Sequence, residues 1–127
     1  MIQTGIDLVE IKRIQKSMKN PRFLTRVFSS DEIAMFRERK FPVQTVAANF
    51  CAKEAFAKAL GCGIRGFAFQ DISVLRDSLG RPYLRLEGPA EAMAKAAGAQ
   101  SFSVSLTHTR SCAAAVVVCE CRKGEEK

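Results

Sequence analysis

Phe50-Cys51-Ala52-Lys53-Glu54-Ala55-Phe56-Ala57-Lys58-Ala59-Leu60-Gly61 is the stretch that decides the fold. At about 100° per residue, Ala52, Ala55, Phe56 and Ala59 line one side of a helix. Phe50 and Ala57 point roughly the other way, so this helix is apolar almost all round. Such a helix is normally buried. It nevertheless carries Glu54, and burying a carboxylate is costly unless the carboxylate is paired or binds a metal. The sequence therefore predicts a buried central helix over 43–60 and a partner for Glu54.

Three shorter helices are expected before the central one. The first follows a short strand over 2–6, the second ends near residue 27, and Phe41-Pro42 ends the third. Their starts are marked by helix-capping or helix-opening pairs, namely Asp7 with Glu10, Asn20 with Pro21, and Ser29 with Glu32.

The second half of the chain changes character. Alternating or β-branched residues predict strands over 70–76, 83–86, 102–106 and 113–121, with a turn over 77–80. A small alanine-rich helix over 89–97 lies between the second and third of these strands, and residues 122–127 form a polar tail. The expected class is α+β, with helices packed on a small antiparallel sheet in one domain over 1–127.

Composition narrows the function classes. The chain has 127 residues, 47% of them hydrophobic, and a net charge of +7, which favours an acidic partner or substrate. It contains no apolar run long enough to cross a membrane and no secretory signal pattern, so we expect a cytoplasmic protein. Its 5 cysteines lack a framework spacing and are expected to be reduced. With 1 histidine in the chain, a structural zinc site at Cys119 and Cys121 is not expected.

Asp7 is one candidate partner for Glu54. Two carboxylates repel each other unless a cation lies between them. Proteins usually hold Mg²⁺ with one or two carboxylates, waters and substrate phosphate oxygens. Two simpler interpretations stay open: Asp7 as a plain helix cap, and Glu54 in an ion pair with Lys58 one helical turn away.

Other residues near this pair suit a phosphate-containing ligand. Lys53 and Lys58 flank Glu54 and either contact a polyphosphate or extend to solvent. The glycine-rich loop over 61–66 can bring backbone N–H groups to phosphate. His108 ends a strand among hydroxyl side chains, which suits a phosphate or ribose contact. Ser105 and His108 face opposite sides of a strand, so serine hydrolysis is not expected.

Four ordered segments resemble the holo-[acyl-carrier-protein] synthase family of 4'-phosphopantetheinyl transferases. They span essentially the whole chain: residues 5–14 (GIDLVEIKRI), residues 28–32 (FSSDE), residues 50–61 (FCAKEAFAKALG) and residues 103–109 (SVSLTHT). A Lys-Glu-Ala helix alone would be weak evidence, whereas four blocks in the right order are specific.

The resemblance implies transfer of the 4'-phosphopantetheine arm of coenzyme A to a serine of apo acyl carrier protein, in fatty acid biosynthesis. It implies Mg²⁺ held by Asp7, Glu54 and the coenzyme A pyrophosphate. With the flanking Lys53 added to these two ligands, the expected catalytic residues are Asp7, Glu54 and Lys53. Adenosine 3',5'-bisphosphate is the second product. The nucleophile then belongs to the partner, in agreement with the lack of an obvious one in this chain.

The same resemblance implies binding positions and an assembly. The positions that match coenzyme A contacts are Lys58, Gly61, His108 and Thr109. The basic first helix and the segment after it match the surface that docks acidic acyl carrier protein, with Arg13, Lys16, Arg22 and Arg26 as the expected contacts. Family members form homotrimers with active sites at the subunit interfaces.

Two positions depart from the family pattern. Asn49 stands where many members carry Arg, and Ala57 where some carry Ser. One phosphate contact is therefore lost or supplied by another residue, while the expected metal ligands are retained. Glu54, a metal-bound water and another carboxylate all remain candidates for the general base.

Two other classes of function were weighed. The basic stretch over 12–26 suits a nucleic-acid-binding module, but aromatic residues are few, none is Trp, and no nucleic-acid-binding signature is present. A membrane-surface adaptor would use the first helix, whose apolar stripe is narrow and lacks Trp. We therefore expect neither nucleic acid nor a membrane as the partner.

Overall fold

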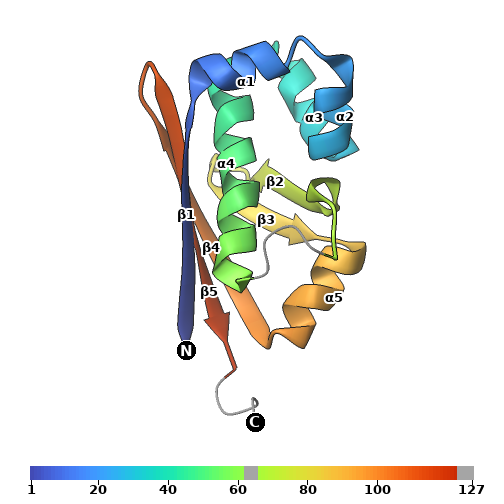
Figure 1. Cartoon of the computed structure of the whole chain (residues 1–127), viewed down its shortest axis with the longest axis vertical. Coiled ribbons are helices and arrows are strands. Elements are labelled where there is room, and N and C mark those ends of the chain that lie inside the picture. The colour runs from blue at the N-terminus through green and yellow to red at the C-terminus, as the bar shows by residue number, and fades with distance from the viewer. Residues whose placement is uncertain (62–65, 123–127) are drawn as a thin grey trace.

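A long central helix packed on a three-stranded sheet organises the molecule (Figure 1). The computed structural model describes residues 1–61 and 66–122. The main sheet is antiparallel with strand order β1-β5-β4, formed by Ile2–Glu10, Cys112–Cys121 and Ala99–His108. Helix α4 (Val43–Leu60) has the bounds expected from the sequence and lies along one face of this sheet. The α+β class is confirmed.

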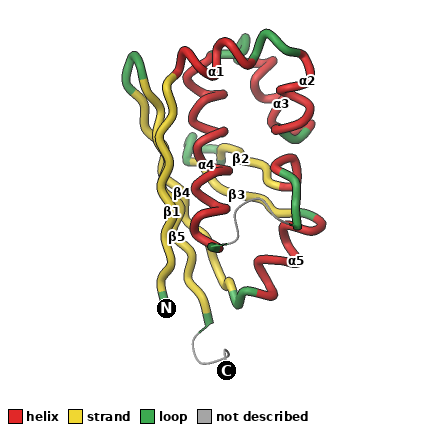
Figure 2. Tube along the Cα trace, in the orientation of Figure 1, coloured by secondary structure: helices red, strands yellow, loops and turns green. Residues whose placement is uncertain are grey.

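Three short helices gather at one end of α4, as Figure 2 shows. They are α1 (Ile11–Ser17), α2 (Pro21–Val27) and α3 (Ser30–Glu38). Asn20 accepts a hydrogen bond from Arg22 N at 3.0 Å and caps α2. Ser29 and Glu32 form the expected capping box of α3.

The second half forms a separate small sheet rather than one continuous sheet. A 3₁₀ turn, η1 (Phe69–Asp71), leads into β2 (Ile72–Arg76), which pairs antiparallel with β3 (Pro82–Leu86). Helix α5 (Gly88–Ala96) follows and leads back to β4 at the edge of the main sheet. The expectation of a single antiparallel sheet is therefore corrected to two sheets.

The first strand is longer than expected, and this corrects the interpretation of Asp7. β1 runs to Glu10, so Asp7 lies inside the strand, opposite Ala115 of β5, and caps no helix. Glu10 occupies the N-cap of α1 and makes no side-chain capping bond there. Because strand residues alternate, Asp7 faces the same side as buried Val9, which is the side that carries α4.

β1 and α4 approach each other unusually closely. A Cβ atom added at Gly5 would lie 2.0 Å from Ala55 O and 2.7 Å from Ala59 N, which is sterically impossible without moving one element. Glycine on the strand and alanines on the helix therefore set the spacing of the two elements. This contact lies two residues before Asp7, so it also sets the distance from Asp7 to the helix.

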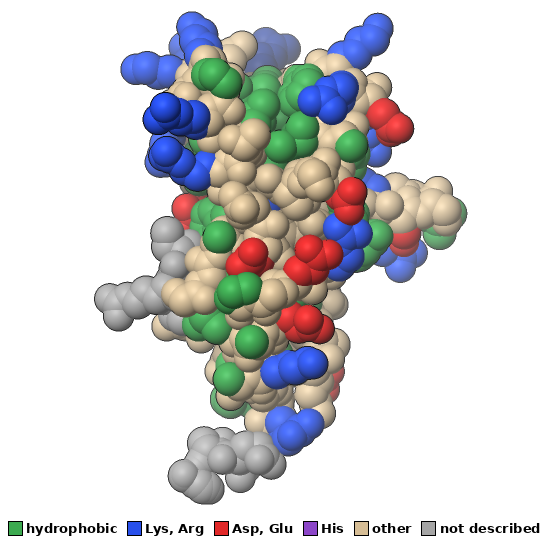
Figure 3. All heavy atoms as spheres, turned by 90° about the vertical axis from the view of Figure 1, so that its right-hand side faces the viewer, with side chains coloured by type: hydrophobic (Ala, Val, Ile, Leu, Met, Phe, Trp, Pro, Cys, Tyr) green, Lys and Arg blue, Asp and Glu red, His purple; other side chains and the backbone are tan. Residues whose placement is uncertain are grey.

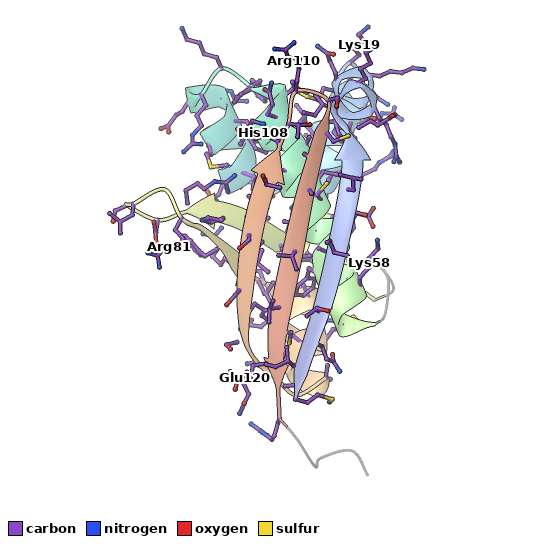
Figure 4. The ribbon with its side chains drawn as sticks, turned by 90° about the vertical axis from the view of Figure 1, so that its left-hand side faces the viewer. Lys19, Lys58, Arg81, His108, Arg110 and Glu120 are labelled. Atoms are coloured by element: carbon purple, nitrogen blue, oxygen red, sulfur yellow. The ribbon has the colours of Figure 1, made fainter. Side chains whose placement is uncertain are left out.

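The opposite face of the main sheet carries no helix in the part of the chain described (Figure 4). Its β1 side chains include three exposed apolar ones, Ile2, Ile6 and Leu8, each more than half exposed. The β4 side chains on this face are hydroxyls, at Ser101, Ser103, Ser105 and Thr107. None of the described helices is long and apolar enough to span a bilayer.

Candidate active site

Asp7 and Glu54 come together where β1 crosses α4. The Asp7 side chain is 17% exposed, and its Oδ1 accepts a hydrogen bond from Lys58 Nζ at 3.2 Å. The same ammonium group donates to Ile6 O at 3.0 Å. Lys58 therefore forms its ion pair across the strand–helix contact with Asp7, instead of the expected pair with Glu54.

Glu54 experiences both carboxylate repulsion and cation attraction. Burial raises the pKa of Glu54, the Asp7 charge raises it further, and Lys58 and Arg13 act in the opposite direction. The charges that act on Glu54 thus come from β1, α1 and α4. Two carboxylates close enough to interact, with a lysine and an arginine that also act on them, are arranged to accept a hard cation and a phosphate.

Cys51 borders this pair of carboxylates, and its thiol is unreactive. Its thiol donates to Ala113 O at 3.4 Å and is fully buried. Burial, followed by the charges of Asp7 and Glu54, raises the pKa of the Cys51 thiol to about 12. The protonated thiol is neither a nucleophile nor a metal ligand at neutral pH.

Lys53 does not join Asp7 and Glu54, which corrects its expected place in the site. Its side chain is 0% exposed, and Nζ contacts Glu32 Oε1 at 2.5 Å, Phe69 O at 2.8 Å and Ile72 O. Burial lowers the pKa of Lys53, and Glu32 opposes that shift. Lys53 therefore joins α4 to α3 and to the start of β2, and we assign it a structural role.

The expected coenzyme A contacts fall into two separate groups. Lys58 and Gly61 lie near the β1 edge, where Gly61 ends α4 in the left-handed conformation with φ 76°. His108 and Thr109 lie at the far end of β4, and Figure 4 shows His108 and Lys58 at opposite edges of the sheet. One chain does not bring the two groups together. The rest of the expected phosphate loop, residues 62–65, lies outside the described residues.

Thr109 also has a local structural function. Its Oγ1 accepts hydrogen bonds from Ser111 N at 3.2 Å and Cys112 N at 3.1 Å, so it closes the turn between β4 and β5. His108 precedes this turn and is exposed. The turn thereby holds His108 at the end of a rigid strand pair.

A basic pocket of about 460 Å³ adjoins His108 and was not foreseen from the sequence. Its cations are Arg39, which follows α3, and Arg76 and Arg81, which lie on the two sides of the turn between β2 and β3. Its other wall is the last part of β4 and residues Gln44, Thr45 and Ala48 at the start of α4. The only sequence signal was an arginine on each side of the 77–80 turn, and a turn alone does not show what it faces.

The remaining expected residues form a basic surface. Arg13, Lys16, Arg22 and Arg26 are all exposed on α1 and α2. Most of the lysine and arginine side chains visible in Figure 3 gather over this end of the molecule, and most of the acidic ones lie lower. Arg13 belongs to this surface and also acts on Glu54, so the basic surface begins at the carboxylate pair.

Comparison with known proteins identifies the class. Residues 3–117 match the family model of the 4'-phosphopantetheinyl transferase superfamily. The chain belongs to this superfamily.

Within the superfamily the chain is similar to proteins named holo-[acyl-carrier-protein] synthase. The Moorella thermoacetica protein is 42% identical over 127 residues, 99% of each chain. The Clostridium botulinum protein is 44% identical over 117 residues, 91% of this chain and 94% of the relative. The solved Helicobacter pylori synthase in complex with coenzyme A is 33% identical with a TM-score of 0.80, covering 94% of this chain and 100% of that one.

Proposed function

We propose that this chain is a holo-[acyl-carrier-protein] synthase that serves fatty acid biosynthesis. It transfers the 4'-phosphopantetheine group of coenzyme A to a serine of apo acyl carrier protein and releases adenosine 3',5'-bisphosphate. The observation that carries the proposal is the meeting of Asp7 and Glu54 beside Lys58 and Arg13. The solved relative that binds coenzyme A supports the choice of donor.

The residues present fit Mg²⁺. Asp7 and Glu54 offer hard oxygen donors, and their mutual repulsion raises the pKa of Glu54 in addition to the larger effect of burial. Among residues 1–61 and 66–122, no cluster of three or more His, Cys, Asp or Glu is placed to hold a metal. Two carboxylates completed by waters and substrate phosphate oxygens is the usual arrangement for Mg²⁺. When bound, the ion would neutralise charge on the coenzyme A pyrophosphate.

The chain's own residues position the reacting groups. Lys58 and Arg13 attract the pyrophosphate to the carboxylate pair and stabilise negative charge as it develops. The carrier serine oxygen forms a bond to the phosphorus that bears pantetheine. The bond from that phosphorus to the bridging oxygen breaks, the adenosine bisphosphate leaves with the electron pair, and the serine proton passes to a base.

We further propose that active sites form between copies in a homotrimer. His108 and Thr109 lie at the opposite sheet edge from Lys58, so a ligand touching both groups needs a second chain. The helix-free sheet face with exposed Ile6 and Leu8 supports such an assembly, because exposed apolar side chains on a strand favour burial against a partner.

The acidic carrier protein would dock on the surface formed by α1 and α2. The net charge of +7 and the exposed Arg13, Lys16, Arg22 and Arg26 would steer an acidic partner toward Glu54. We also propose a cytoplasmic location. The free thiols at Cys51, Cys112, Cys119 and Cys121 support it, because such thiols persist in a reducing compartment.

Intact-mass spectrometry tests the function. Apo acyl carrier protein is incubated with the chain, coenzyme A and Mg²⁺, and a parallel sample contains EDTA. We expect a mass gain of one phosphopantetheine that EDTA abolishes and added Mg²⁺ restores. An unchanged mass across several apo carrier proteins, with the chain folded by circular dichroism, would overturn the proposal.

A further inference from the structure

A buried asparagine holds one arginine of the basic pocket in a fixed position. Asn49 is 0% exposed, and its Nδ2 donates to Glu32 Oε2 and to Val74 O, both at 3.0 Å. Both amide protons are therefore used, and Oδ1 is left to accept a hydrogen bond from Arg76 Nη2 at 3.0 Å. Glu32 thus fixes the orientation of the Asn49 amide, and the amide fixes the Arg76 guanidinium.

On the side that faces the pocket, Arg76 has other cations near it and no carboxylate. Arg39 and Arg81 line the same pocket, and none of its lining residues is acidic. Burial lowers the pKa of Arg76, the Arg39 charge lowers it further, and Glu32 opposes both. Glu32 is itself shared with Lys53. Arg76 Nη1 also contacts the neutral carbonyls Val74 O and Leu75 O, both at 3.4 Å. A guanidinium group beside a pocket without a carboxylate is suited to bind an anion there.

Coenzyme A carries two phosphate groupings, and the proposed function places its pyrophosphate at Asp7 and Glu54. The pocket contains arginines and no carboxylate, so it suits an anion bound without a metal. The remaining grouping, the 3'-phosphate monoester, has this chemistry. We propose that Arg76 binds the 3'-phosphate of coenzyme A and that Asn49 is the residue that positions Arg76; this inference rests on the proposed function.

Transfer kinetics with coenzyme A and with 3'-dephospho-coenzyme A test the role of Arg76. For Arg76→Gln we expect kcat/KM with coenzyme A to fall about 10–100-fold, mainly through KM, as for loss of a charged hydrogen bond. The rate with the dephospho substrate should change less than about 2-fold. Arg37→Gln is the control: it makes the same charge change at an exposed residue of α3 outside the pocket. It should leave the ratio of kcat/KM for the two substrates unchanged.

Asn49→Leu tests positioning, because it removes the acceptor for Arg76. We expect a smaller loss, about 3–10-fold, confined again to the substrate with the 3'-phosphate. If Asn49 had a purely structural role, kcat/KM would fall equally with both substrates. If Asn49→Leu does not fold, Arg76→Lys supplies the second variant. This variant keeps the charge but lacks the planar group that Asn49 orients. We therefore expect it to retain only part of the preference for coenzyme A over 3'-dephospho-coenzyme A.

A binding measurement separates this proposal from the proposed function. By calorimetry, the wild-type chain should bind adenosine 3',5'-bisphosphate more tightly than adenosine 5'-monophosphate, and Arg76→Gln should remove that difference. If transfer occurs but the preference is unaffected in Arg76→Gln, the Arg76 assignment is wrong and the function stands. If no transfer occurs but the preference exists and depends on Arg76, the function is wrong and the phosphate site stands.

Discussion

At the scale of single residues, the site brings the carboxylates of Asp7 and Glu54 together, and this does not favour folding. Burial and the Asp7 charge both raise the pKa of Glu54, so its ionised form destabilises the chain. Lys58 and Arg13 offset this only in part. Such an arrangement is typical of a site kept for binding a cation at some loss of stability.

Glu54→Gln should therefore stabilise the chain while largely abolishing transfer. The raised folded-state pKa means that ionising Glu54 weakens folding as the pH rises, so the gain should be absent near pH 4 and present at pH 7. We expect a melting temperature higher by about 1–3 °C at neutral pH without Mg²⁺. Calorimetry over this pH range measures it, with Glu91→Gln as the exposed control on α5. A variant that melts lower at neutral pH, or that transfers at the wild-type rate, would contradict this view of Glu54.

Gly5 offers a second test at this scale. Because an added Cβ would lie 2.0 Å from Ala55 O, Gly5→Ala must push β1 away from α4. We expect a loss of about 2–4 kcal/mol in the free energy of unfolding, together with reduced transfer as Asp7 moves from Glu54. Urea denaturation measures the first quantity. Gly80→Ala is the control for an added methyl group, since it has open space but a positive φ of 84° and should cost less. Unaltered stability of Gly5→Ala would mean that this close approach does not exist.

At the scale of elements, the sequence predicted helices better than the first strand. Helix α4 was predicted over its full length because its apolar residues follow a helical period and Gly61 ends it. β1 was not, because its inward residues are Gly5, Asp7 and Val9, while its large apolar residues face outward. This reverses the usual inward-facing pattern of a strand, and Leu8 then imitates the helical spacing of Ile11 and Ile14.

The sequence predicted part of the candidate site and missed the residues that only the folded chain brings together. Glu54 was proposed because its helix is apolar almost all round, and Asp7 was proposed as its partner although Asp7 lies in a strand and not at a helix start. The structure brings the two carboxylates close enough to interact, with Glu54 only partly buried. The partner of Lys53 was missed because Glu32 already had a complete local explanation as a helix cap. The basic pocket was missed because Arg39 and the walls from β4 and α4 meet the Arg76–Arg81 hairpin only through tertiary packing.

The ion pair of Lys53 with Glu32 gives a prediction for how α3, α4 and β2 are held together. Lys53→Met leaves the buried Glu32 carboxylate without its cation, and we expect a loss of about 3–5 kcal/mol in the free energy of unfolding. Adding Glu32→Gln should restore part of that loss, because the unpaired charge is then removed. Denaturant titration of the single and double variants measures both. Full stability of Lys53→Met combined with lost transfer would show that Lys53 acts on substrate instead.

At the scale of the whole molecule, charge is distributed unevenly. The basic surface of α1 and α2 lies at one end, beside the carboxylate pair (Figure 3). The helix-free sheet face occupies one side, and the pocket at His108 lies across the sheet from Lys58 (Figure 4). The proposed carrier-protein surface is therefore separate from the helix-free sheet face, and a coenzyme A molecule that reaches both Lys58 and His108 would span two copies.

Charge reversal on α2 tests the docking surface. Arg22→Glu should lower kcat/KM for the carrier protein about 10-fold at low salt, because it weakens electrostatic steering, and should leave coenzyme A affinity unchanged. The difference from wild type should shrink as salt is added. Lys95→Glu on α5 is the matched control at the far end of the molecule. Equal losses for carrier protein and coenzyme A would contradict docking at this surface.

The most direct test of the central claim, a metal-dependent transferase site shared between copies, is complementation of two impaired variants. Asp7→Ala and His108→Ala chains are assayed alone and after being unfolded and refolded together in equal amounts, with transfer measured by intact mass. We predict little transfer from Asp7→Ala, reduced transfer from His108→Ala, and in the mixture a regain to roughly a quarter of the wild-type rate, since random assembly pairs an intact Asp7 edge with an intact His108 edge at that frequency. Mixed oligomers that transfer no faster than the average of the two variants would contradict the shared site.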